Sequence, residues 1–467
     1  MSQARMEPTV SKASKTLLVA IPYIIGGALV IDRKAIEYLT NRGIEAIVVA
    51  KEKRFFGAGF DTYLLEKNFR GKFEIALGLL RNLVFADSTR PHSETMELKV
   101  REFDKRYSLW GVFRRQLGRR VGKWGIVKKA LSWTDANLFP DKFYGGLFET
   151  TKPDAVFVVQ PFLYDIYPVL RRARKNRIPI IAYVPSWDNL TSKWQIPTAI
   201  DKLIVWNQGM KEEATQFLGY SEEDVLISGV PQFDSYGRGR NGTQRIDFIK
   251  SLGGDPDKKI LTYTTGTLEL ADKDTEPEIV RLIYDAIEDG TIPGSQLIVR
   301  LHPRRNPIDF EDFKHLENLI IQAPGRKSDD PRTSGYYWIS DVKDYNRWAD
   351  TLAHTDVLIN VASTVTIESC IFDTPVVNVA FDGKKRKEYL KSVRRHFDYS
   401  HYRKILKQGG VRVAWSDYEL FEIINNYLDD PSMDRDGRQK IVKSQCFQVD
   451  GLGQERLLNY IIQFVGS

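Results

Sequence analysis

Short apolar runs alternate with longer amphipathic stretches through most of this chain. The first run, at residues 16–24, is separated from the next, at 44–50, by an amphipathic stretch at 30–43. Apolar runs of strand length, separated by stretches of helical period, predict βαβ units and a parallel sheet. Further runs of this kind lie at 154–160, 178–185, 202–207, 224–230, 258–267, 296–303, 318–324, 356–364 and 375–381.

The alternation pauses at a polar, glycine-rich segment near residues 236–247 and then resumes. A chain of 467 residues is also longer than one core ordinarily needs. We therefore predict an α/β protein of two Rossmann-like domains, 1–238 and 239–467, with a central crevice. No strand follows the last amphipathic stretch, at 453–465, and we expect this helix to cross back to the N-terminal domain.

The most apolar run, residues 17–31, is interrupted by Pro22 and Gly26-Gly27. It is shorter than the roughly 20 residues that a membrane-spanning helix needs, and no signal-peptide cleavage site follows. We interpret it as a strand, a glycine turn and a helix. The two cysteines, Cys370 and Cys446, cannot build a disulfide framework or a thiolate metal site. Together these features predict a cytoplasmic protein.

The charge distribution indicates an anionic partner, because the formal net charge is +7. Between Arg101 and Lys129, ten residues are Lys or Arg and two are acidic, interleaved with Trp110, Phe113 and Trp124. This basic stretch is either a solvated helix face whose aromatic residues pack on the domain, or a surface that contacts anionic lipid or an anionic acceptor. The second interpretation predicts peripheral binding at the inner face of the plasma membrane. No nucleic-acid-binding motif accompanies it, so nucleic acid is not an expected partner.

Candidate chemistry is concentrated in NVASTVTIESCIFDTPVV, residues 360–377. We interpret 356–360 as a buried strand and 366–373 as the first turns of a helix. Ser363 and Thr364 then lie at the helix N-terminus, where they either cap the helix or donate to a phosphate. Glu368 follows one turn later, among small and apolar residues. A carboxylate there is placed to accept both hydroxyls of a ribose whose phosphates occupy the helix start.

This spacing resembles the donor-nucleotide motif of GT-B glycosyltransferases, such as the peptidoglycan N-acetylglucosaminyltransferase and lipid A disaccharide synthase. Ser363, Thr364 and Glu368 match that motif position for position. In those families the turn binds the donor diphosphate and the Glu binds the ribose. The resemblance implies a GT-B fold and a nucleotide-activated donor of the UDP or CMP/CDP type.

Other segments resemble CDP-glycerol glycerophosphotransferases and the bacterial sialyl- and Kdo-transferases. His302 and Pro303 match their strand-end His-Pro motif, and Asp450, Gly451 and Arg456 resemble the Asp-Gly…Arg close of the glycerophosphotransferases. The resemblance covers the second half of the chain. The first half matches only in architecture.

Several residues at strand ends are candidates to hold the donor phosphates. His302 ends an apolar run and is either a structural histidine or the group that meets the leaving phosphate, helped by Arg304 or Arg305. Thr265 and Gly266 follow the first strand of the second half, where a hydroxyl and a bare backbone N–H would face the same phosphates.

The base that deprotonates the acceptor is a more open question. Asp188 follows a strand of the first half and is either this base or the N-cap of the next helix, and Asp165 is a rival base. His401 falls in a stretch, 397–411, that we expect to be a polar loop, and we expect it to contact substrate.

We predict no metal site and no cofactor, because no histidine pair has metal-ligand spacing and the GT-B plan that the chain resembles needs no metal. The expected function is a glycosyltransferase that moves a sugar from a nucleotide-activated donor to a hydroxyl of a glycan or lipid-linked acceptor, in surface polysaccharide or glycolipid synthesis. The alternatives are a CDP-glycerol-type polyol-phosphate transferase, a sugar-nucleotide 2-epimerase, and a silent GT-B scaffold that binds lipid or nucleic acid.

Overall fold

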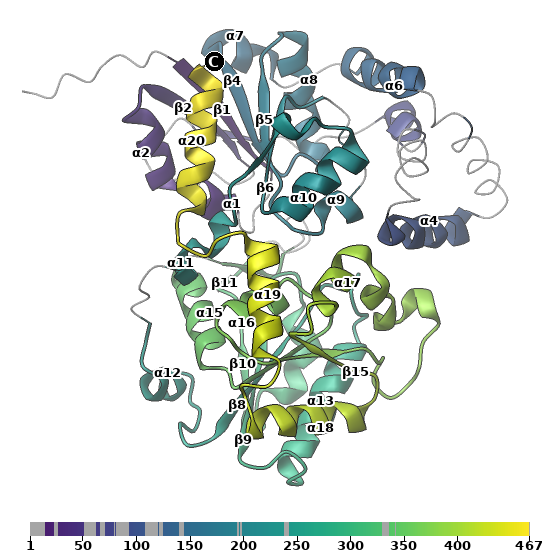
Figure 1. Cartoon of the computed structure of the whole chain (residues 1–467), viewed down its shortest axis with the longest axis vertical. Helices are drawn as coiled ribbons and strands as arrows, with labels where there is room; N and C mark the ends of the chain where they lie inside the picture. The colour runs from purple at the N-terminus through teal and green to yellow at the C-terminus, as the bar shows by residue number, and fades with distance from the viewer. Residues whose placement is uncertain are drawn as a thin grey trace, which may run out of the picture. The chain divides into compact units, whose positions relative to one another are not determined.

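Two compact units make up this computed structural model (Figure 1). The structure describes residues 15–22, 27–50, 62–65, 71–78, 80, 93–107, 120, 125–139, 144–193, 196, 199–237, 242–328, 336–340 and 342–466. The first unit comprises Met1–Thr89, Leu109–Gln232 and Leu452–Ser467, and the second comprises Arg90–Ser108 and Phe233–Gly451. The expected boundary lay between residues 238 and 239, with residues 90–108 in the N-terminal domain.

The first unit is built on a seven-stranded sheet in the order β3-β2-β1-β4-β5-β6-β7, and every neighbouring pair is parallel. Its strands are β1 Lys15–Ile21, β2 Ile44–Ala50, β3 Thr62–Leu64, β4 Ala155–Val159, β5 Ile180–Tyr183, β6 Lys202–Val205 and β7 Val225–Ile227. Its helices are α1 Gly27–Val30, α2 Arg33–Thr40, α6 Gly125–Leu138, α7 Gly145–Thr151, α8 Tyr167–Lys175, α9 Asn189–Ser192, α10 Gln208–Glu213 and α20 Gly453–Gly466.

The last helix, α20, belongs to this first unit. The hydroxyl of Tyr38 donates to Asn459 Oδ1 at 3.1 Å, and Arg456 Nε donates to the carbonyl of Ser228 at 2.8 Å. The apolar side of α20 is buried. The chain therefore returns to the first unit after the second unit is complete.

The second unit is built on a six-stranded parallel sheet in the order β10-β9-β8-β13-β14-β15. Its strands are β8 Lys259–Thr264, β9 Ser295–Arg300, β10 Leu319–Gln322, β13 Val357–Asn360, β14 Val376–Val379 and β15 Arg412–Ala414, and β11 Arg326–Lys327 pairs with β12 Trp338–Ile339 in an antiparallel ribbon. Its helices are α4 Glu94–Tyr107, α11 Asp234–Gly237, α12 Arg245–Ser251, α13 Thr275–Glu288, α15 Val342–His354, α16 Val365–Ile371, α17 Ser400–Leu406, α18 Asp417–Asp429 and α19 Arg435–Cys446.

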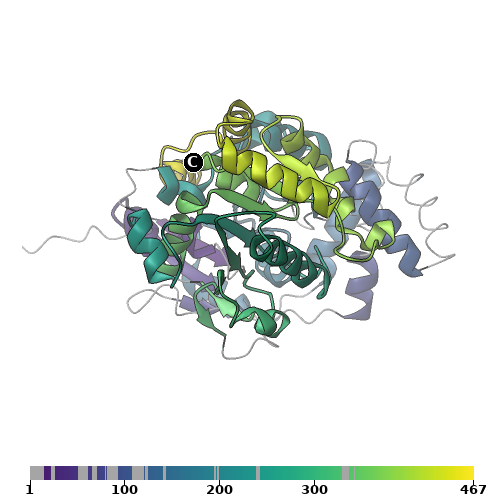
Figure 2. The same cartoon turned by 90° about the horizontal axis from the view of Figure 1, so that it is seen from below.

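Buried apolar strands form the centre of this second unit, with fully buried residues such as Leu261, Ile359 and Val377. Helices α13 and α18 lie side by side in both views (Figures 1 and 2). Helix α16 packs against α15 and α19. Apolar runs that are buried on both faces are typical of parallel sheets, so the predicted α/β class with two parallel-sheet domains is confirmed.

Candidate functional site

The candidate donor residues lie where the strand order of the second sheet reverses. Strand β8 is flanked by β9 on one side and β13 on the other, so the connections leave in opposite directions from β8. Open α/β sheets bind ligands at the carboxyl ends of the strands at such a switch point. Thr265 follows β8, His302 follows β9, and Ser363 follows β13. The fold therefore gathers these residues at one edge of one sheet.

Helix α16 begins at this edge, as the sequence predicts. Thr364 is its N-cap residue, and the hydroxyl of Ser363 accepts a bond from Val365 N at 3.4 Å. Both side chains are half-buried. The long distance marks a weak cap, so the Ser363 hydroxyl is available to a ligand at the positive end of the helix.

A buried polar cluster holds α16 in place. The hydroxyl of Tyr402 lies 2.9 Å from Thr366 Oγ1 and donates to Asn378 Oδ1 at 2.9 Å, and Asn378 Nδ2 donates to Asn360 Oδ1 at 2.6 Å. These four side chains come from α17, α16, β14 and β13. Because buried polar groups are costly unless they are bonded, this cluster favours one position of α16 against the sheet.

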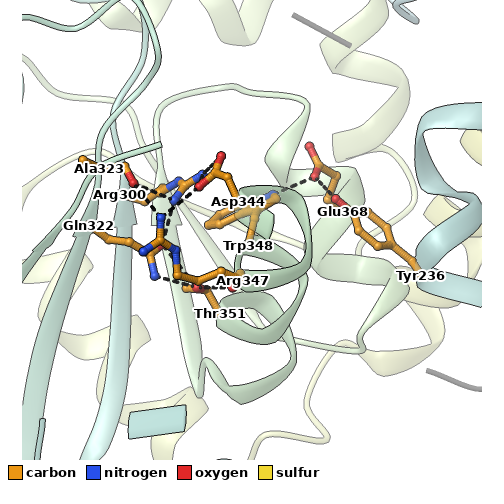
Figure 3. A network of polar contacts seen from close by, with 9 residues as sticks. All are labelled: Tyr236, Arg300, Gln322, Ala323, Asp344, Arg347, Trp348, Thr351 and Glu368. Atoms are coloured by element: carbon orange, nitrogen blue, oxygen red, sulfur yellow. Dashed lines mark hydrogen bonds and ion pairs between the residues drawn. The ribbon is translucent and has the colours of Figure 1, made fainter. Parts of the chain in front are cut away.

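Glu368 points into a polar network with one carboxylate oxygen engaged (Figure 3). Its Oε2 accepts from the hydroxyl of Tyr236 at 2.8 Å and from the indole N–H of Trp348 at 3.0 Å. No partner is recorded for Oε1 among the described residues. Burial raises the pKa of Glu368, while the bonds from Trp348 and Tyr236 oppose that rise. The second oxygen is thus left to accept from a ligand hydroxyl.

A buried ion pair supports the indole that holds Glu368. Arg300 donates to both oxygens of Asp344 at 2.9 Å, and its guanidinium carbon lies 5.3 Å from the ring centroid of Trp348 (Figure 3). One terminal nitrogen of the guanidinium makes both of these charge-assisted bonds, which hold it in place, and the aromatic face packs on it. The positive charge of Arg300 also favours the ionised form of Glu368.

His302 is held as a neutral imidazole. Its Nδ1 accepts from the backbone N–H of Arg304 at 3.0 Å, which places the ring proton on Nε2. Burial, followed by the charge of Arg304, lowers the pKa of His302 to about 4. The sequence suggested a histidine that titrates near neutrality. In the structure, His302 instead stays neutral at pH 7 and can donate a hydrogen bond through its Nε2–H.

The turn after β8 makes hydrogen bonds within the protein that the sequence does not indicate. The N–H of Gly266 donates to Glu276 Oε1 at 2.8 Å, so it is not the bare donor that we expected. Burial raises the pKa of Glu276 to about 7, against the influence of Arg305. Thr265 accepts from the backbone N–H of His302 at 2.8 Å and thereby joins the two strand ends. Among the described residues, the buried hydroxyl of Thr264 has no hydrogen-bond partner.

The two arginines after His302 have different surroundings. Arg304 is exposed and pairs with Glu269 at 3.2 Å. Arg305 is 0% exposed, and its guanidinium lies 3.6 Å from Glu276 and 3.3 Å from Asp309. A side chain enclosed in this way cannot reach a ligand, so Arg305 is a structural residue and only Arg304 stays a candidate.

Asp188 lies in the first unit, after β5. It is the N-cap residue of α9, but its side chain makes no capping bond to the backbone. Instead, the hydroxyls of Ser186 and Ser192 each donate to it at 2.5 Å, and Asn189 Nδ2 donates at 3.2 Å. These donors fix the orientation of the carboxylate. The role of Asp188 as the acceptor base stays a prediction.

His401 differs from the expectation in both position and surroundings. The stretch that we expected to be a loop contains α17, and His401 is buried in it at 8% exposure. Its Nδ1 lies 3.5 Å from the hydroxyl of Thr95, which also accepts from the backbone N–H of Ser400 at 2.9 Å. His401 therefore contributes to the packing of α4 on α17, and we do not place it in the ligand site.

Three residues of the site were not identified from the sequence. Tyr236 lies in the glycine-rich segment that we treated as a linker, and Trp348 and Arg300 lie in a helix and a strand without a recognisable motif. A pattern of apolar positions does not reveal which polar side chains converge in space. The only available signal was the position of Arg300 two residues before His302.

Part of the basic stretch at 101–129 falls outside the described residues. Most of the basic stretch, including Arg114, Arg115 and Arg119, lies outside them, while Arg120 is exposed.

Within the described part of the chain, no group of three or more His, Cys, Asp or Glu residues could hold a metal ion. Likewise, none of the described helices is both long and apolar enough to span a membrane.

Comparisons with known structures agree with this architecture. A UDP co-structure of Staphylococcus aureus MnaA is 14% identical, with a TM-score of 0.54 and 97% of each chain covered. UDP-GlcNAc 2-epimerase from Neisseria meningitidis, bound to UDP-GlcNAc, is 10% identical, with a TM-score of 0.54 and coverage of 96% of this chain and 100% of that one. A glycosyltransferase from Rickettsia africae is 10% identical, with a TM-score of 0.50 and coverage of 97% and 99%. The chain has the GT-B fold.

Similarity in sequence covers less of the chain than similarity in structure. No protein-family model matches the chain. A teichoic acid glycerol-phosphate primase of Staphylococcus aureus is 22% identical over 184 residues, which are 39% of this chain and 40% of that protein. The similarity thus spans less than half of either protein.

Proposed function

We propose that this protein is a transferase that uses a nucleotide-activated donor and attaches the donated group to a hydroxyl of a glycan or lipid-linked acceptor of the cell envelope. The observation that carries the proposal is the geometry of Glu368. One oxygen is held by Tyr236 and Trp348, and the other is left for a hydroxyl at the switch point of the second sheet. A ribose supplies such a hydroxyl, and its phosphates would extend toward Ser363.

The donor phosphates would lie between the start of α16 and the end of β9. The Ser363 and Thr265 hydroxyls and the Nε2–H of His302 are neutral donors there, and Arg304 supplies a positive charge. Hydrogen bonds aimed at a leaving phosphate strengthen as charge develops on it, so they lower the barrier more than they improve binding. We propose that these groups hold the leaving nucleotide without a metal ion. An unchanged rate in EDTA is the expected result.

We propose a glycosyl group as the donated group, and a polyol phosphate is the second candidate. The sequence match to a teichoic acid glycerol-phosphate primase favours the second. The UDP-GlcNAc 2-epimerases among the structural neighbours keep epimerisation as a rival. That reaction needs several acids and a histidine around the sugar, and no such motif is evident in the first half of this sequence.

Two measurements test the proposal. A thermal-shift screen against UDP, GDP, CMP, CDP and dTDP identifies the nucleotide, because a ligand at 100 times its dissociation constant stabilises the folded state by about 2.7 kcal/mol. Glu368→Gln should lower that stabilisation by about half or more. Each activated donor that carries the selected nucleotide is then incubated with and without a glycan acceptor.

The products separate the alternatives. A transferase releases the nucleotide only when the acceptor is present, and the acceptor gains either a sugar or a polyol phosphate. An epimerase converts the nucleotide sugar without any acceptor. A silent scaffold binds nucleotide, lipid or nucleic acid and converts nothing. Absence of a thermal shift with every nucleotide would rule out the donor site at Glu368.

A further inference from the structure

A cationic cavity lies in the second unit, apart from the donor residues. It has a volume of about 420 Å³ and is formed by the segments that follow β14 and β15, together with Leu282 of α13. Its lining includes Phe381, Lys384, Arg386, Arg394 and Trp415. None of the candidate donor residues contributes to it. Its size falls within the range of roughly 300–1,000 Å³ that is usual for small-molecule sites.

The positive charges of this cavity are not matched by ion pairs. Lys384 and Arg386 are exposed, and among the described residues no carboxylate forms an ion pair with either side chain, although the backbone N–H of Lys384 donates to Glu278 Oε2 at 2.8 Å. Arg394 donates from Nε to Ser392 Oγ at 3.0 Å and from a terminal nitrogen to the carbonyl of Lys387 at 3.4 Å. These three cations outnumber the two carboxylates of the lining, so the cavity favours an anion.

The acidic residues of the cavity are occupied by backbone donors. Asp382 is buried and accepts from the N–H of Val393 at 2.9 Å and of Lys387 at 3.0 Å. Asp417 accepts from the N–H of Tyr418 at 2.8 Å. These bonds hold Asp382 in the segment after β14 and Asp417 in the first turn of α18. The two carboxylates lower the net positive charge of the lining, but among the described residues neither forms an ion pair with Lys384, Arg386 or Arg394.

Trp415 gives the cavity an apolar wall. It is 53% exposed although it directly follows a core strand, and Phe381 is only partly buried beside the core. A large, half-exposed aromatic residue next to cations suits a ligand with an anionic group and a ring or carbon chain. Phosphate is the anion that Lys and Arg side chains commonly bind in such sites.

We propose that this cavity binds a phosphate ester of a sugar or polyol, with the phosphate between Lys384, Arg386 and Arg394 and the organic part on Trp415. The site is separate from the donor site, and its existence does not depend on the proposed function. If that function holds, the cavity suits a phosphate group of the acceptor.

Calorimetric titration of the full chain tests this site, with glucose 1-phosphate, inorganic phosphate and glucose as probes. Glucose 1-phosphate should bind, phosphate should bind more weakly, and glucose should not bind. Lys384→Gln and Arg386→Gln should each lower the affinity for glucose 1-phosphate by roughly 10-fold, the effect of one charge-assisted hydrogen bond. Trp415→Ala should weaken glucose 1-phosphate but not inorganic phosphate.

Lys385→Gln is the matched control, because Lys385 stands between the two cations, is exposed and does not line the cavity. It removes the same charge and should leave the affinity unchanged. An equal loss in all three variants would show general attraction by positive charge and overturn the site. Glu368→Gln and saturating nucleotide should not affect the titration. Competition by nucleotide would place the ester in the donor site, and no binding of any probe would also refute the proposal.

Discussion

Glu368 is the residue whose substitution most directly tests the ribose interaction. Loss of a charged hydrogen-bond acceptor costs about 1.5–3 kcal/mol, so we expect Glu368→Gln to weaken nucleotide binding by roughly 10- to 150-fold. Trp348→Phe should cause a smaller loss, because the carboxylate remains but one of its two donors is removed. Calorimetric titration of the selected nucleotide measures both.

The control for this pair is Glu422→Gln on the exposed side of α18, which should bind nucleotide like the wild type. Unchanged affinity in a folded Glu368→Gln variant would eliminate the ribose role. Trp348→Phe with normal affinity would show only that Tyr236 alone is enough to orient the carboxylate.

His302 should affect turnover more than binding. Its neutral Nε2–H can bond to the leaving phosphate, and this bond strengthens only as negative charge develops. We expect His302→Ala to lower turnover by roughly 10²-fold while nucleotide affinity changes little. His302→Gln, which keeps an N–H near the same position, should recover part of the rate. Equal losses in turnover and affinity would instead indicate ground-state binding.

His302 should also make stability depend on pH. Its pKa is about 4 in the folded chain against an ordinary value of 6.5, so between these values the unfolded chain binds a proton that the folded chain excludes. The free energy of unfolding should therefore fall as pH drops from 6.5 to 4, by about 1–3 kcal/mol from this group. His396, with a pKa lowered to about 3 by burial and Arg395, acts in the same direction.

Denaturant unfolding at pH 7 and pH 5 measures this effect. His302→Gln should show a smaller fall in stability than the wild type. The exposed His315 provides the matched substitution, and His315→Gln should keep the wild-type dependence. Parallel curves for wild type and His302→Gln would mean that His302 is not held neutral.

At this residue scale, the sequence was informative where a motif combined spacing with an unusual residue type. Glu368 was identified because an acid among small and apolar residues has few structural explanations. Tyr236 and Trp348 were missed because they approach Glu368 from elements 132 and 20 positions away, and no local pattern marks them. The ligand-binding roles predicted for Arg305 and Gly266 were wrong because both residues contact the buried Glu276. The strand-end motif gives no sign of these contacts.

At the scale of elements, the β13–α16–β14 unit followed the predicted order, because apolar runs buried on both faces are unambiguous. The stretch containing α17 was misjudged. Its helical residues Ser400–Leu406 are mostly polar, and what stabilises them is Tyr402 and Ile405 packing into the core together with bonds to the distant Thr95. Tertiary contacts of this kind override a weak local pattern.

The buried cluster around Tyr402 permits a test of how α16 is positioned. Tyr402→Phe removes the hydroxyl that bonds to Thr366 and Asn378, so buried polar groups lose a partner. We expect a loss of about 1–3 kcal/mol in the free energy of unfolding and weaker nucleotide binding, because Ser363 and Glu368 depend on the position of α16. Tyr389→Phe is the control, since its hydroxyl bonds to Asp398 at the surface. Equal stability of the two variants would contradict a structural role for the cluster.

At the scale of the whole molecule, two domains with parallel sheets were predictable from the alternation of runs, whereas the strand order within each sheet was not predicted. The residues that make up each unit were less predictable. Residues 90–108 group with the second unit because Glu94 pairs with Arg403 at 2.7 Å and Thr95 bonds to Ser400. These contacts join positions about 300 residues apart, and neither end carries a sequence signal.

The basic stretch at 101–129 leads to the last prediction, which concerns the whole molecule and a membrane surface. A lipid-linked acceptor would lie at a membrane, where each Lys or Arg near anionic lipid contributes about 1 kcal/mol and the attraction fades over a Debye length. We expect the protein to bind anionic liposomes at low salt and to dissociate as salt rises. Replacement of Arg114, Arg115, Arg119 and Arg120 by Glu should abolish binding while activity on a soluble acceptor survives, because none of the proposed donor-site residues is changed. Co-sedimentation with anionic and with neutral liposomes measures this. A wild-type protein that ignores anionic liposomes at low salt would leave the stretch as a solvated face or an acceptor groove.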